Sequence, residues 1–186
     1  MMSLRRVLAG ALVGVIVAAA GCGKDDDDAK PTDTLEGTWK VAQSAENSSS
    51  CEGELTPKTD GPVFFRLLLK SLIPGTPAVL SYNDCSDAAT CEDTFDLSWN
   101  FSTKTNDTWV GESQMGGGFT TCTYIRTETT AKLVDGKPLL ERRSYSRRDQ
   151  PTGADGKCGS KGPEYEAGVA GAPCTSYEVL RGEAAQ

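Results

Sequence analysis

The chain has 186 residues, with 19 basic and 26 acidic side chains, a formal net charge of −7 and no histidine. An acidic protein repels nucleic acid, so no nucleic-acid partner is expected. The absence of histidine excludes Ser-His-Asp and Cys-His triads, histidine-ligated zinc and histidine acid–base chemistry. We therefore expect no catalytic residue, no metal site and no cofactor.

The first residues have the layout of a secretory signal. Arg5 and Arg6 precede an apolar run over residues 7–20, and small residues lead up to Cys22. The run is shorter than the roughly 20 apolar residues that a transmembrane helix needs. Residues 1–21 are therefore predicted to be a signal peptide that is removed.

The sequence Ala19-Ala20-Gly21-Cys22 resembles the lipobox of bacterial lipoproteins. The resemblance implies that the Cys22 thiol carries diacylglycerol and becomes the first residue of the mature chain. Gly23 stands where an aspartate would favour inner-membrane retention in that family, so the resemblance favours the outer membrane, with the domain facing the periplasm or the cell surface. The alternative is an ordinary cleaved signal peptide.

Residues 22–33 include four consecutive aspartates and few apolar side chains, which predicts a flexible, solvated tether. Residues 34–183 are then long enough for a single domain with its own core. This part holds an even set of cysteines, which in an exported domain predicts three disulfides. The set is Cys51, Cys85, Cys91, Cys122, Cys158 and Cys174.

The cysteines contain no CxxC pair, so a thiolate metal site is not favoured. Six cysteines allow about fifteen pairings, and the sequence does not choose among them. Proximity along the chain favours Cys85 with Cys91 and Cys158 with Cys174, which leaves Cys51 with Cys122.

The domain begins with a turn and a strand over residues 34–41, followed by a polar loop over residues 44–57. Residues 62–73 are predicted to form a short helix, because Pro62 suits a first turn, Arg66 and Lys70 are four residues apart, and Pro74 and Gly75 follow. Such a helix could cover the mouth of a barrel. The alternative is a pair of buried strands.

Strands are predicted over residues 78–82, 94–101, 108–112, 119–133, 137–147 and 175–181. Residues 94–101 alternate apolar and polar side chains, and Asp135-Gly136 is a strong hairpin signal. Residues 151–173 are rich in Gly, Pro and Ala and are predicted to form a loop. Sequential hairpins predict an all-β, antiparallel meander closed into a barrel, with a β-sandwich as the alternative.

Gly37-Thr38-Trp39 at the first strand, and Arg181 in the last, resemble the lipocalin family. The resemblance implies an eight-stranded up-and-down barrel whose closed end is plugged by Trp39. It also implies that Arg181 lies across the tryptophan ring in a cation–π contact, and that Gly37 allows close approach of the backbone. The alternative is a core tryptophan of an unrelated sandwich.

Two groups of residues are candidates for binding a ligand. The first is an apolar lining that could equally fill the barrel: Phe95, Leu97, Trp99, Phe101 and Trp109. The second shares one strand face and could meet an anionic head group: Arg143, Tyr145 and Arg147. The alternative for this face is pairing with Glu112, Glu128 or Glu141 on neighbouring strands.

These observations predict a lipid-anchored envelope protein that binds a small apolar or amphiphilic ligand in its barrel and is not an enzyme. The alternative is a module that binds another envelope protein. A hydrolase is a distant third, because the spacing of Asp93, Asp96 and Glu112 selects no acid–base pair among them.

Overall fold

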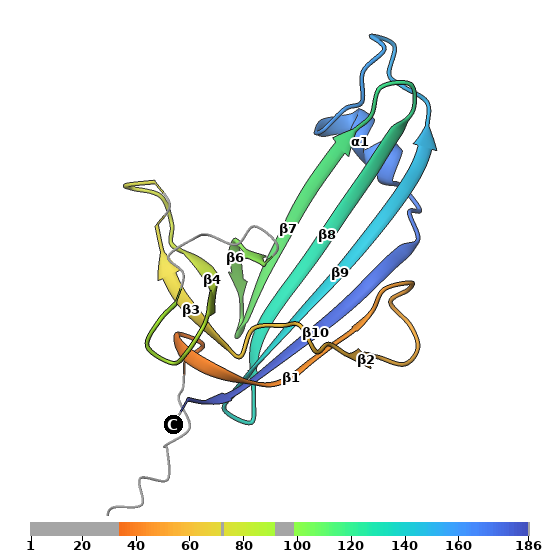
Figure 1. Cartoon of the computed structure of the whole chain (residues 1–186). Helices are drawn as coiled ribbons and strands as arrows, with labels where there is room; N and C mark the ends of the chain where they lie inside the picture. The colour runs from red at the N-terminus through yellow and green to blue at the C-terminus, as the bar shows by residue number, and fades with distance from the viewer. Residues whose placement is uncertain (1–33, 72, 92–98, 186) are drawn as a thin grey trace, which may run out of the picture.

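The structure is a computed structural model that describes residues 34–71, 73–91 and 99–185. Most of these residues form antiparallel strands, and one short helix follows β9 (Figure 1). The elements are β1 (Gly37–Asn47), β2 (Thr56–Pro57), β3 (Phe64–Lys70), β4 (Val79–Cys85), β5 (Asn100–Phe101), β6 (Thr103–Thr105), β7 (Thr108–Gly117), β8 (Cys122–Val134), β9 (Lys137–Gln150), α1 (Gly162–Val169) and β10 (Cys174–Ala184).

The strands form one sheet in the order β5-β4-β3-β1-β10-β9-β8-β7-β6, with β2 paired to β1. β5 and β6 are separated only by Ser102: β5 pairs with β4 and β6 pairs with β7, while the Ser102 amide donates to the Val110 carbonyl at 2.9 Å. This short segment brings the two edges of the sheet together, and β10 returns beside β1. The all-β, antiparallel barrel that the sequence predicts is confirmed, and the sheet is nearly closed.

The interior of the barrel is filled by side chains. Aromatic rings follow one another across β3, β4 and the segment around β5, with centroid distances of 5.7 Å from Phe65 to Tyr82, 5.8 Å from Tyr82 to Trp99 and 6.2 Å from Trp99 to Phe101. Leu140 from β9 packs in the same cluster and is fully buried. These described side chains therefore occupy the middle of the barrel.

The helix predicted over residues 62–73 is wrong, because residues 64–70 form β3. Phe65 and Leu67 are both 0% exposed and face the core, while β3 pairs with β1 on one side and β4 on the other. The four-residue spacing of Arg66 and Lys70 gives only a local preference for a helix. Hydrogen bonding to a neighbouring strand on both edges overrides this preference.

The helix α1 lies instead within residues 151–173, which the sequence predicts to be a loop. A proline lies in its first turn, followed by Glu164, which suits the positive end of a helix. The helix covers the far ends of the long strands β8 and β9 (Figure 1). Tyr165 is buried there, donates from its hydroxyl to the Ile125 carbonyl at 2.8 Å and meets Tyr124 edge-on.

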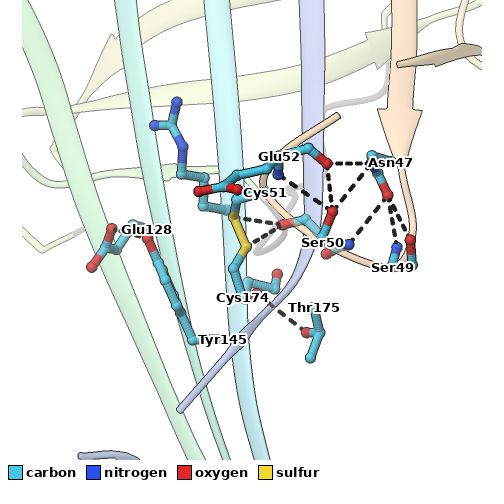
Figure 2. Close-up of a disulfide and its surroundings, with 12 residues drawn as sticks. Asn47, Ser49, Ser50, Cys51, Glu52, Glu128, Tyr145, Cys174 and Thr175 are labelled. Atoms are coloured by element: carbon cyan, nitrogen blue, oxygen red, sulfur yellow. Dashed lines mark hydrogen bonds between the residues drawn. A yellow bond between two sulfur atoms is a disulfide. The ribbon is translucent and has the colours of Figure 1, made fainter. Parts of the chain in front are cut away.

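Three disulfides form, as predicted, and Cys85 pairs with Cys91. The other two predicted pairs are wrong: Cys51 bonds to Cys174, and Cys122 bonds to Cys158. Pairing between β1 and β10 brings the loop after β1 beside the start of β10, which is where Cys51 and Cys174 lie (Figure 2). The bridge between Cys122 and Cys158 joins β8 to the segment before α1.

The loop that carries Cys51 is also held by hydrogen bonds around Asn47 (Figure 2). Its side-chain oxygen accepts from the amide and hydroxyl of Ser49 at 3.0 and 2.9 Å, and its side-chain nitrogen donates to the Glu52 carbonyl at 2.9 Å. The loop is therefore ordered by its own polar contacts as well as by the bridge.

Candidate functional site

A pocket of about 590 Å³ opens at the end of the barrel where the described chain begins, and we call it the base pocket. Small-molecule sites commonly have volumes of roughly 300–1,000 Å³. Its walls come from the residues just before β1, from β3 and β4, and from the β6–β7 and β8–β9 hairpins. The lining residues are Thr34, Leu35, Glu36, Leu69, Leu80, Lys104, Asp107, Trp109, Leu133 and Gly136.

Two hydrogen bonds hold the residues before β1 in place at this pocket. The indole nitrogen of the buried Trp39 donates to the Leu35 carbonyl at 3.0 Å. The Leu69 amide donates to a Glu36 carboxylate oxygen at 3.2 Å, which joins the start of β1 to the end of β3. The residues before β1 are thus held by one local contact and by one contact to β3, which is distant in sequence.

Two tight hairpin turns complete the rim. Asp135 and Gly136 have φ values of 54° and 71°, which is the conformation that the predicted Asp-Gly turn requires. Asn106 also has a positive φ, of 54°, in the turn between β6 and β7. These turns carry Gly136 and Asp107 to the edge of the pocket.

The base pocket has an apolar wall and a charged rim. Leu80 is buried, while Trp109 and Leu133 are half-buried and pack against the barrel core. Lys104 supplies a positive charge at the rim, opposite in sign to Asp107. Apolar surface bordered by a few polar groups suits a molecule with an apolar part and a polar end.

The predicted apolar lining is only partly at this site. Trp109 lines the base pocket. Trp99 and Phe101 are 4% and 0% exposed and belong to the filled core, which is the alternative that the sequence left open. Phe95 and Leu97 lie outside the described residues.

The predicted polar face of β9 lies outside the barrel core. The Arg143 guanidinium lies 4.6 Å from the Tyr177 ring centroid and donates to Glu141 at 3.3 Å, and the Tyr145 hydroxyl donates to Glu128 at 3.2 Å. Burial, and secondarily the nearby Glu128 carboxylate, raises the pKa of Tyr145 above its usual value.

Arg147 donates to the Ala170 carbonyl at 2.9 Å, next to the end of α1. Arg143, Tyr145 and Arg147 are therefore engaged in contacts with neighbouring elements and do not line an interior cavity. Of the carboxylates in the sequence alternative, Glu128 accepts from Tyr145 across two strands, whereas Glu141 accepts from Arg143 within β9.

The inward face of β9 carries an ionic cluster that the sequence analysis missed. Arg142 pairs with Glu178 and lies 5.2 Å from the Trp99 ring centroid, and Lys58 reaches the same carboxylate at 2.9 Å. The hydrogen bond to Glu178 is the main cause that raises the pKa of Lys58. These residues border a smaller cavity of about 220 Å³. The adjacent arginines in the sequence gave no sign of which one points inward.

The implied contact between Trp39 and Arg181 is not formed. Alternation along β10 turns Leu180 and Gly182 inward, whereas Arg181 is exposed. Trp39 is covered instead by the chain before β1. Gly37 has a φ of 137°, a conformation that residues with a side chain rarely adopt, so its role is conformational.

Among residues 34–71, 73–91 and 99–185, no group of three or more acidic or cysteine side chains is placed to hold a metal ion. No helix in this described part of the chain has the length and apolar character needed to cross a membrane. Cys22 and the predicted tether lie outside the described residues. The chain matches no family model, no curated protein and no solved structure.

Proposed function

We propose that this chain is a lipid-anchored, non-enzymatic protein of the bacterial cell envelope that holds a small apolar or amphiphilic molecule in the base pocket. The observation that carries the proposal is the half-buried pair Trp109 and Leu133 beneath the charged rim of the pocket. Aromatic and aliphatic surface would cover the apolar part of the ligand. Lys104 and Asp107 would orient its polar end.

The filled interior modifies the way in which such a ligand would bind. Tyr82, Trp99 and Phe101 occupy the middle of the barrel, so the ligand would enter one end of the barrel and would not be enclosed along its length. Part of the ligand would remain at the mouth of the base pocket, where it could be exchanged with a membrane or another carrier.

The anchor rests on the sequence around Cys22, with the domain attached through residues 23–33. Cys22→Ala should abolish labelling by radioactive fatty acid and leave the signal peptide uncleaved. Detection of lipid label on the Cys22→Ala protein would contradict the assignment of Cys22 as the acylated residue.

Native mass spectrometry of the purified protein tests the ligand site. We expect a small molecule to accompany the protein, and we expect Trp109→Ala with Leu133→Ser to lose it. Met115→Ala is the matched control, because Met115 is also apolar and is 58% exposed on β7 away from the pocket. Near-ultraviolet circular dichroism checks that each variant remains folded.

An empty base pocket together with a specific co-purifying protein would instead favour the alternative, a protein-interaction module. Retention of the small molecule by the Trp109 and Leu133 variant would place the ligand elsewhere. Turnover of ester or glycan substrates would contradict the non-enzymatic assignment.

A further inference from the structure

The end of β3 and the loop that joins it to β4 carry apolar side chains that the barrel does not cover. Leu68, Leu69 and Ile73 are 39%, 44% and 64% exposed, and we call them, together with Ser71 and residues 74–76, the hairpin tip. Successive residues of a strand point to opposite faces, so exposure of both leucines means that neither face of the strand end is buried. Figure 1 shows this hairpin extending away from the barrel.

Hydrogen bonds within the turn pair the hydroxyls of the hairpin tip. The hydroxyls of Ser71 and Thr76 each donate to the Ile73 carbonyl at 2.7 Å, and the Thr76 amide donates to the same oxygen at 3.0 Å. Gly75 adopts a positive φ of 87° that closes the turn. Removing a polar group from water costs less free energy when the group is already hydrogen-bonded. This turn can therefore approach an apolar phase more readily than a loop without such bonds.

The hairpin tip lies beside the base pocket and the point where the described chain begins. Leu69 lines the pocket and is hydrogen-bonded to Glu36, while Thr34 lies on the pocket rim. Eleven residues lie between Cys22 and Thr34 in the sequence, and this segment spans at most about 40 Å when fully extended. An acyl group on Cys22 would therefore keep this end of the barrel near the bilayer.

We propose that the hairpin tip docks on the lipid surface, with Leu69 and Ile73 inserted at the interface, and turns the mouth of the base pocket toward the bilayer. This inference rests on the lipid anchor of the proposed function. Apolar insertion, and not charge, would drive the contact, because the chain has 26 acidic and 19 basic side chains, two of the basic ones in the predicted signal peptide. Anionic lipid would repel this excess of negative charge. The partner is therefore a zwitterionic lipid surface.

Fluorescence quenching in vesicles tests the docking. The acylated protein with Ile73→Trp is incorporated into phosphatidylcholine vesicles with or without brominated acyl chains. Phe119→Trp is the matched control, because Phe119 is 99% exposed in the turn between β7 and β8 and away from the base pocket. We expect bromination to lower the fluorescence of the Ile73→Trp protein, and the Phe119→Trp protein to behave like the parent.

Adding Leu68→Ser and Leu69→Ser to Ile73→Trp should abolish most of this loss, because the tip then lacks the apolar surface that holds it at the interface. If all the proteins sediment with vesicles but bromination does not affect Ile73→Trp, docking is overturned while the anchor stands. If none sediments, the anchor fails and docking fails with it. Equal quenching of Ile73→Trp and Phe119→Trp would show non-specific adsorption and would also overturn the proposal.

Discussion

Removing the disulfide between Cys51 and Cys174 should cost the most stability of the three bridges, because it closes the longest loop. The two cysteines are 123 residues apart. The other two bridges lie within this stretch and shorten the loop that it can form, Cys122–Cys158 by 36 residues and Cys85–Cys91 by 6. About 80 residues then remain in the closed loop, for which the loop-closure relation gives about 4.5 kcal/mol at 25 °C. The same relation gives about 2.4 kcal/mol for the bridge between Cys85 and Cys91.

The assay is urea unfolding, followed by tryptophan fluorescence, of two variants. One carries Cys51→Ala and Cys174→Ala, and the other carries Cys85→Ala and Cys91→Ala. The variant lacking Cys51 and Cys174 should lose about 2 kcal/mol more free energy of unfolding than the variant lacking Cys85 and Cys91. The contacts of Asn47 hold the Cys51 loop in the folded state, so the main effect should lie in the unfolded chain and should appear as a larger m-value. Equal losses in the two variants would refute the argument from loop length.

Three further results are expected from urea unfolding. Arg142→Ala should cost about 3 kcal/mol, because it leaves the largely buried Glu178 carboxylate with one cation fewer; a loss below about 1 kcal/mol, the range of a surface pair, would contradict this. Gly182→Ala should lower the free energy of unfolding by about 1–3 kcal/mol, because the added Cβ would lie 2.9 Å from Phe65 and 3.0 Å from Trp39. Unchanged stability would mean that the core side chains shift to make room for it. Burial, and secondarily the hydrogen bond to Glu141, raises the pKa of Tyr177 above 10.0, so the free energy of unfolding should fall as the pH rises above about 10. Tyr177→Phe should make this fall with pH less steep. An equally steep fall in the variant would exclude Tyr177 as its source.

The fold could be predicted from the sequence where local signals and tertiary pairing agree. Asp135 and Gly136 give a two-residue turn, and the strands on either side of it follow. The prediction failed at β3, where the charges of Arg66 and Lys70 match a helix. Nothing local to that segment shows that β1 and β4 will pair with both of its edges.

The candidate site could be predicted less well. The alternation of side chains along a strand shows which residues share a face, but it does not show which face points into the barrel. On β9, both Arg142 and Arg143 are charged, so neither face is marked as the core side. The choice is made by neighbours in space: Leu140 packs with Leu180 of β10 and Ala131 of β8, and this turns Arg142 inward. Trp109 was predicted only as one of several apolar residues that could line the barrel, and it is the one of them that lines the base pocket.

The segment over residues 100–105 forms a seam in the barrel wall. Two residues pair with β4 and three with β7, whereas β8 and β9 run beside each other over 13 and 14 residues. Short pairings open with a smaller free energy than long ones. Breathing of the barrel should therefore begin at this seam, and amide hydrogen exchange would register it there before the long strands lose protection.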